Sequence, residues 1–142
     1  MTIEEIQQEI IEEFSLFGDW MEKYEYIIEL GKSLPLIDPS LMDEDHLIRG
    51  CQSRVWLNAE EKDGIVLYTA DSEAVITKGI IALLVRVLNQ QPASEIAQAE
   101  LHFIDAVGLS DHLSPTRANG LVSMIKQMKY YAIGLQGQTQ LN

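Results

Sequence analysis

The stretch 73–88 constrains the fold of this chain more than any other feature, because the helix that it predicts is apolar on most of its faces. A helix with one apolar face needs cover on one side only, whereas a helix that is apolar nearly all round lies at the centre of a protein. We therefore expect 73–88 to form the central helix, capped at its start by Asp71 and Ser72. Its apolar residues are Val75, Ile76, Ile80, Ile81, Leu83, Leu84, Val87 and Leu88.

Residues 3–17 and 20–30 predict two short helices in an antiparallel hairpin, because apolar residues recur in both at helical spacing. The helix boundaries carry recognisable end signals. These are Thr2 and Glu5 as a capping box, Gly18 as the end of the first helix, Asp19 as an N-cap and Gly31 as a C′ residue.

The middle of the chain predicts a small antiparallel sheet. Residues 55–59 and 65–70 have strand character, and 61–64 form the hairpin turn between them. Two prolines make 32–46 a loop, and 46–48 is expected as a short strand that leads into the next loop.

The C-terminal third predicts further helices. Residues 90–93 form a connector, and Ser94 caps a helix over 94–107 that Gly108 closes. Ser114 and Pro115 begin the last helix, because serine is a good N-cap and proline is favoured at the first helical position. We expect the polar tail 136–142 to fray.

Length and charge narrow the class of protein. A chain of 142 residues with 46% hydrophobic content predicts a single domain over residues 1–142. The net charge of −12 disfavours nucleic acid and anionic membranes as partners. The N-terminus does not resemble a signal peptide, so we expect a location in the reducing cytoplasm.

Acidic residues are concentrated in residues 1–30, which hold nine of them and one lysine, Lys23. Such a run is usually a solvated helix face. The alternative is a docking surface for a basic partner.

Cys51 is the only cysteine and the strongest candidate for chemistry. One thiol cannot form an internal disulfide, so it is either an inert buried residue or a nucleophile. Gly50 permits a tight bend beside it, and Arg49 and Arg54 bring two cations to an otherwise acidic chain. Nearby cations favour the thiolate, so these neighbours favour a nucleophile.

Several motifs, in order along the chain, resemble those of the SufE family, which includes the CsdE branch. The motifs are 26–35, 50–57, 70–74 with 78–79, and 108–109 with 112–117 and 119–121. Together with the residue patterns, the resemblance predicts a single α+β domain. In it a three-stranded antiparallel sheet packs against about five helices, as in SufE and IscU-type proteins.

The resemblance also implies a function. Family members accept sulfur from a pyridoxal-phosphate cysteine desulfurase of the SufS or CsdA type, stimulate that enzyme, and pass the sulfur to an iron–sulfur cluster scaffold. This protein would then be a sulfur carrier with no cofactor or metal of its own, and not itself an enzyme.

The matching residues receive roles through the same resemblance. Cys51 would carry the persulfide on a loop that tucks into an apolar pocket, with Gly50 as its pivot and Gln52 and Ser53 as flanks. Arg117 would stabilise the anionic sulfur, although a surface ion pair is its ordinary explanation. Asn119 and Gly120 are expected to be helix-packing positions and not contacts to the sulfur. The residues expected to border the desulfurase-docking surface are Arg49, Arg54, Asp71 and Ser72.

Two alternatives to the sulfur carrier remain open from the sequence. The protein could regulate a desulfurase without any role for Cys51, or it could be a stand-alone thiol peroxidase or peptidase. Cluster assembly on this chain is disfavoured, because only one cysteine is available. His46 lies five residues before Cys51 and is a candidate base for its thiol, but a solvated loop histidine is the simpler interpretation.

Overall fold

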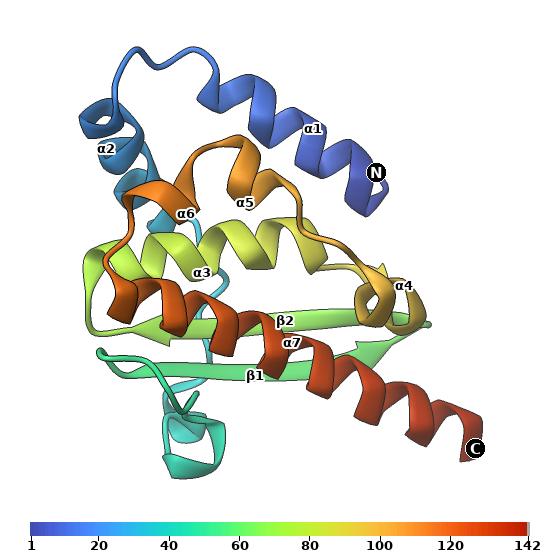
Figure 1. Cartoon of the computed structure of the whole chain (residues 1–142). Coiled ribbons are helices and arrows are strands. Elements are labelled where there is room, and N and C mark those ends of the chain that lie inside the picture. Colours follow the sequence, from blue (N-terminus) through green and yellow to red (C-terminus); the bar gives the residue numbers. More distant parts are fainter. Residues whose placement is uncertain (142) are drawn as a thin grey trace.

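The computed structural model describes the backbone of residues 1–141 and the side chains of residues 1–136 (Figure 1). The predicted fold class is confirmed: a three-stranded antiparallel sheet packs against helices. The helices are α1 (Ile3–Phe14), α2 (Trp20–Gly31), α3 (Val75–Leu88), α4 (Ala93–Gln98), α5 (Phe103–Ala106), α6 (Leu109–His112) and α7 (Pro115–Leu141), with two 3₁₀ turns, η1 (Pro39–Leu41) and η2 (Glu44–His46).

The sheet has the order β1-β2-β3. Strands β1 (Val55–Lys62) and β2 (Ile65–Ser72) form the predicted hairpin. Its turn contains Asp63 and Gly64, both with positive φ (54° and 86°), the conformation that a two-residue hairpin favours.

The third strand differs from the expectation. It is β3 (Gln91–Pro92), which pairs with the start of β2 in the segment expected to be a connector. Residues 46–48 form only an isolated bridge from Leu47 to Trp56, because the chain turns away at once into the next loop.

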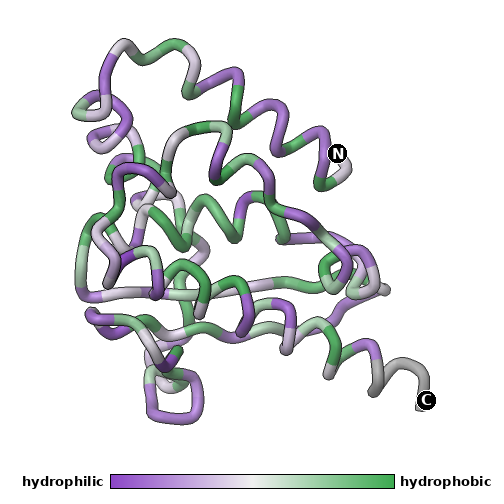
Figure 2. Tube along the Cα trace, viewed as in Figure 1, coloured by the Kyte–Doolittle hydropathy of each residue, from purple (hydrophilic) through white to green (hydrophobic). Residues whose placement is uncertain are grey.

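Helix α3 is central, as predicted. It lies between the sheet on one side and α1, α2, α5 and α6 on the other (Figure 1). Every residue of α3 is buried except Val75, Lys78 and Arg86, and Figure 2 shows its trace as largely hydrophobic. A single hydrophobic cluster, running from Ile3 to Ala132, surrounds it.

Helices α2 and α3 approach each other closely at two glycines. A Cβ atom on Gly79 would lie 2.1 Å from the Ile27 carbonyl oxygen, and one on Gly31 would lie 3.1 Å from the Gly79 amide nitrogen. Gly31 was expected just beyond the end of α2, yet it is the last helical residue and is buried. The two glycines therefore let α2 cover the central helix.

The acidic first helix is more than a solvated face. Arg86 on α3 lies 2.7 Å from Glu9 and donates from its other terminal nitrogen to Glu13 at 2.9 Å. These Arg86 hydrogen bonds hold the pKa of Glu13 below its usual value. Glu4 lies 2.7 Å from His102. Part of the N-terminal charge thus fastens α1 to the rest of the protein.

Three expected helix boundaries are wrong. The predicted helix over 94–107 is two helices, α4 and α5, because Ala99 is extended (φ −64°, ψ 137°) and interrupts it. Ser94 lies inside α4, where Pro92 occupies the N-cap position. The first helix ends at Phe14 and not at residue 17.

Helix α7 begins as predicted and is fastened to the sheet. The Ser114 hydroxyl accepts from the Arg117 amide at 3.3 Å and so caps the helix. The Tyr68 hydroxyl donates to the Met128 carbonyl at 2.6 Å, and the Tyr131 hydroxyl donates to the Leu57 carbonyl at 3.1 Å. The backbone of α7 is helical to Leu141, and the fraying expected over 136–142 stays a prediction.

We predict that Gly79→Ala lowers the free energy of unfolding by at least about 2 kcal/mol, because the added methyl would overlap the α2 backbone. The matched control is Gly134→Ala on α7, where an added Cβ meets nothing within 4 Å. That variant should gain about 0.5–1 kcal/mol from helix propensity. Urea unfolding of both variants measures the difference, and similar stabilities would contradict the close packing.

Candidate functional site: the Cys51 loop

The Cys51 loop, residues 49–54, is closed at its base by the Ile48 amide, which donates to the Val55 carbonyl at 2.8 Å. Ile48 and Val55 are buried, so both ends of the loop are anchored in the core. At its tip Gly50 has φ +95°, a left-handed conformation that residues with a Cβ rarely adopt. The tight bend expected at Gly50 is therefore present.

The loop tip rests on the second turn of α7. The Cys51 thiol lies 3.7 Å from the Gly120 carbonyl, which accepts its hydrogen bond. A Cβ on Gly120 would lie 3.5 Å from the Cys51 sulfur, and one on Gly50 would lie 2.5 Å from the Ser123 hydroxyl. The loop tip thus requires glycine at residue 50, whereas an added Cβ at residue 120 would make only an ordinary van der Waals contact with the sulfur.

The thiol is half-buried, and this burial raises its pKa above the usual value. The two arginines expected to favour the thiolate do not do so here. Arg54 pairs with Glu73 and stands over the Trp56 ring at 5.5 Å, while Arg49 is exposed. In this resting conformation the thiol is therefore protonated at neutral pH.

Beneath the loop lies a cavity of about 40 Å³ that brings the sulfur together with Arg117. Arg117 is exposed and comes from the first turn of α7. Gln52 and Ser53, which were expected to flank Cys51, also line this cavity. Its lining residues include Cys51, Gln52, Ser53, Thr77, Thr116, Arg117, Gly120 and Met124.

Asp71 and Ser72 lie at the end of β2 and do not cap α3, whose N-cap position is Ala74. The Ser72 hydroxyl donates to the Arg54 carbonyl at 2.9 Å. Asp71 lies 3.3 Å from Lys78. These residues therefore brace the end of the Cys51 loop against the start of α3, outside the cavity.

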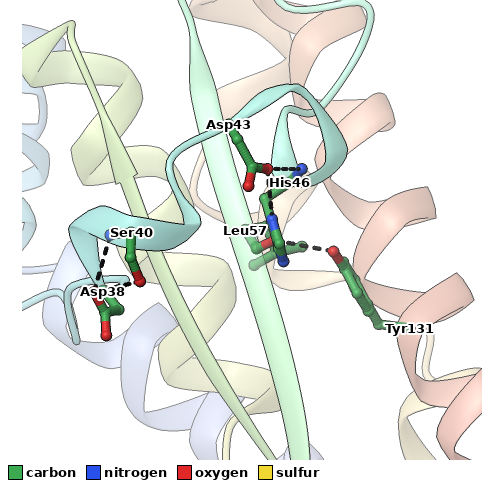
Figure 3. A network of polar contacts seen from close by, with 6 residues as sticks. All are labelled: Asp38, Ser40, Asp43, His46, Leu57 and Tyr131. Atoms are coloured by element: carbon green, nitrogen blue, oxygen red, sulfur yellow. Dashed lines mark hydrogen bonds and ion pairs between the residues drawn. The ribbon is translucent and has the colours of Figure 1, made fainter.

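The histidines are engaged elsewhere. Figure 3 shows His46 beside Asp43, with its Nδ1 atom 2.7 Å from the carboxylate, near the Tyr131–Leu57 hydrogen bond and separate from the Asp38–Ser40 turn. His112 stacks on Trp20 with ring centroids 4.4 Å apart. Among the side chains that the structure describes, no three Cys, His, Asp or Glu residues converge as a metal site would need.

Sequence reasoning missed part of the seat. Gly120 was interpreted as a helix-packing residue, and its carbonyl instead meets the sulfur. Thr77, from the buried α3, was not singled out, and Met124 was expected only as part of the buried stripe of the last helix. A glycine inside a helical pattern was the one available signal, because such glycines usually mark a close approach.

The comparisons with known proteins agree on one family. The family model described as SufE, an Fe–S metabolism associated domain, matches residues 8–132. The chain belongs to the SufE family. Membership confirms the resemblance read from the motifs and associates this SufE-family protein with iron–sulfur metabolism.

Curated SufE-like relatives align over most of this chain. An uncharacterised SufE-like protein of Rhizobium meliloti is 35% identical over 131 residues, covering 89% of this chain and 94% of the relative. The chloroplastic/mitochondrial SufE-like protein 1 of Arabidopsis thaliana is 39% identical over 132 residues, covering 91% of this chain but only 35% of that longer protein.

A solved structure supports the fold. The solution structure of a hypothetical protein from Thermus thermophilus superimposes with a TM-score of 0.75, covering 91% of this chain and 94% of that one. Its sequence identity is 18%, so the likeness concerns the SufE-family fold alone. Within the described part of the chain, no helix is long and apolar enough to cross a membrane.

We predict that alkylation of Cys51 by iodoacetamide rises at higher pH in the folded protein than in urea, because burial raises the thiol pKa. In Gly50→Ala the pH dependence of the alkylation rate should shift toward that measured in urea, because the added methyl would push the loop away from Ser123. Rate constants measured across pH test both statements.

Gly64→Ala is the matched control for this experiment. It imposes the same kind of backbone strain (φ +86°) in open space at the hairpin turn, away from the Cys51 loop. An identical shift in both variants would refute the steric role of the α7 seat.

Proposed function

We propose that this protein is a sulfur carrier. Cys51 takes the outer sulfur from the persulfide of a cysteine desulfurase and delivers it to an iron–sulfur cluster scaffold. Removing the persulfide sulfur frees the enzyme for its next turnover, which is how the protein stimulates it. The observation that carries the proposal is a single thiol, next to a glycine with positive φ, at a small cavity that Arg117 also lines. Family membership supplies the link to iron–sulfur metabolism.

Loading follows the chemistry of thiol–disulfide exchange. Cys51 first gives its proton to solvent, and the thiolate attacks the outer sulfur of the donor persulfide. A new S–S bond forms on Cys51 as the S–S bond on the donor breaks, and the donor cysteine leaves as a thiolate. No outside oxidant or reductant is needed, because one S–S bond replaces another.

The resting loop explains why loading needs a partner. With the thiol half-buried and its pKa raised, little thiolate is present near neutral pH. Moving the tip away from Gly120 would rehydrate the sulfur and increase the thiolate fraction. A desulfurase that draws the loop out would thus expose the nucleophile only at the moment of transfer, which limits oxidation of the sulfur at other times.

Arg117 is suited to stabilise the sulfur once it is charged. Its guanidinium is a cation that lines the same cavity as Cys51. Among the described residues it has no ion-pair partner that would compete for it. The surface ion pair considered from the sequence is therefore not formed.

We predict that incubation with a cysteine desulfurase and cysteine adds one sulfur atom to the protein, and that reductant removes it. Intact-mass spectrometry measures the gain, which should be absent in Cys51→Ser. Full desulfurase stimulation by Cys51→Ser would instead favour the regulator that acts without Cys51. Turnover of a peroxide or a peptide by the protein alone would favour a thiol enzyme.

We predict that Arg117→Ala slows sulfur loading about tenfold while the unfolding midpoint changes little, because Arg117 is exposed and contributes charge near the sulfur. Rapid-quench mass spectrometry gives the loading rate. Lys32→Ala is the control, since it also removes one exposed cation, at the end of α2. Equal rates in the two variants would remove Arg117 from the mechanism.

A further inference from the structure

Charge is segregated in this chain. The stretches 46–59 and 112–142 contain none of the 22 acidic residues but hold five of the ten basic ones. In the fold these two stretches meet, because the Cys51 loop rests on α7. The protein as a whole carries −12, so these two stretches are basic by comparison, and the acidic residues beside them come from other segments, with Glu73 next to Arg54 and Asp43 next to His46. The five cations are Arg49, Arg54, Arg117, Lys126 and Lys129.

Three of these cations remain available. Arg54 pairs with Glu73, and Lys129 donates to the Ala99 carbonyl. The other three are Arg49, Arg117 and Lys126, which form no ion pair with any residue that the structure describes.

Helix α7 also presents an apolar stripe to solvent. Val122, Tyr130 and Ile133 are exposed to 51%, 64% and 51%, which is high for such side chains. Together with Lys126 they follow at intervals of four, four and three residues, so they share one side of the helix. We call these four residues the α7 outer face.

The α7 outer face adjoins the cysteine. Ser123, which touches the loop tip at Gly50, follows Val122 directly and lies three residues before Lys126. Arg117 lies five residues before Val122 on the same helix and borders the cavity that holds the Cys51 sulfur. Ser123 and Arg117 lie on neighbouring sides of the helix, so a partner that covers the α7 outer face and extends around the helix past Ser123 would touch the loop that it has to open.

We propose that the α7 outer face, with Arg49 and Arg117, is the docking surface for the sulfur-donating desulfurase, which would present carboxylates around an apolar centre. Charge complementarity identifies the chemistry of the partner: Arg49, Arg117 and Lys126 form no ion pair among the described residues, and Lys126 lies one helical turn from the exposed Tyr130. Exposed Tyr130 beside Lys126 has the composition of an interface anchor. This inference rests on the carrier function proposed above.

The donor is favoured over the sulfur acceptor because of the state of the loop. The structure has a free, half-buried thiol, which is the form that meets the donor, whereas the acceptor meets the persulfide. When the protein meets the donor, its thiol is still protonated and half-buried and has to become exposed. When it meets the acceptor, Cys51 already carries the persulfide. A docking surface that touches the loop at Ser123 is placed to meet that requirement.

Binding is tested in the Cys51→Ser background, so that no sulfur transfer is required. The probe is the purified cysteine desulfurase of the loading experiment, titrated by isothermal calorimetry. We expect Lys126→Glu and Tyr130→Ala each to raise Kd about tenfold. Added salt should weaken the binding of the parent protein to the desulfurase more than the binding of Lys126→Glu, because the attraction is electrostatic.

Two controls match these variants. Lys32→Glu changes the net charge equally but lies at the end of α2, and Leu16→Ala removes an exposed apolar side chain, 83% accessible, between α1 and α2. Both should bind like the parent. Equal Kd values for Lys126→Glu and Lys32→Glu, or for Tyr130→Ala and Leu16→Ala, would overturn the docking surface.

Other results separate this inference from the proposed function. If wild-type protein gains a sulfur atom while the α7 variants bind and load normally, the carrier function stands and this surface is wrong. If the enzyme binds but Cys51 gains no sulfur, the carrier function fails and the docking inference, which rests on it, fails with it. Sedimentation of the chain with phosphatidylglycerol vesicles, lost in Lys126→Glu, would assign the surface to membranes and overturn it.

Discussion

Close contact between two helix backbones is the constraint on which the rest of the fold depends. At Gly79 there is no room for any side chain against the Ile27 carbonyl, so α2 lies directly on α3. Because α3 is apolar on almost every face, it requires such close cover. Once α1, α2, α5 and α6 shield one side, the sheet and α7 enclose the other.

Helix α7 connects this core to the chemistry. Its middle is fixed to the sheet by the hydroxyls of Tyr68 and Tyr131, while its first turns carry the seat of Cys51. The loop contacts α7 through the Cys51 thiol, which donates to the Gly120 carbonyl, and through Gly50, which lies against Ser123. The proposed carrier function requires only this tip to move, while the helix that supports it stays fixed to the sheet.

The features predicted from sequence were those that local chemistry decides. The capping box at Thr2, the N-cap at Asp19, the hairpin turn and the central helix all follow from nearest-neighbour patterns, and each is present. The bend at Gly50 belongs to the same class, since only glycine accepts its φ readily.

The features that sequence reasoning missed depend on partners distant in the chain. Strand β3 is only two residues long and exists because β2 lies beside it, and the helix break at Ala99 has no proline or glycine to announce it. The pKa of Cys51 was expected to fall because arginines are near in sequence. It rises because folding buries the thiol and directs Arg54 to Glu73.

The hydrogen bond from Tyr131 to Leu57 has a consequence for solubility. β1 is the outer strand of the sheet, and an outer strand offers unpaired backbone groups to strands of other molecules. Tyr131 occupies one of those acceptors, the bridge at Leu47 occupies the neighbouring stretch, and the far end of β1 carries three charged residues in succession. The outer edge of β1 is thereby protected against pairing with strands of other molecules, although the Cys51 loop begins directly beside it.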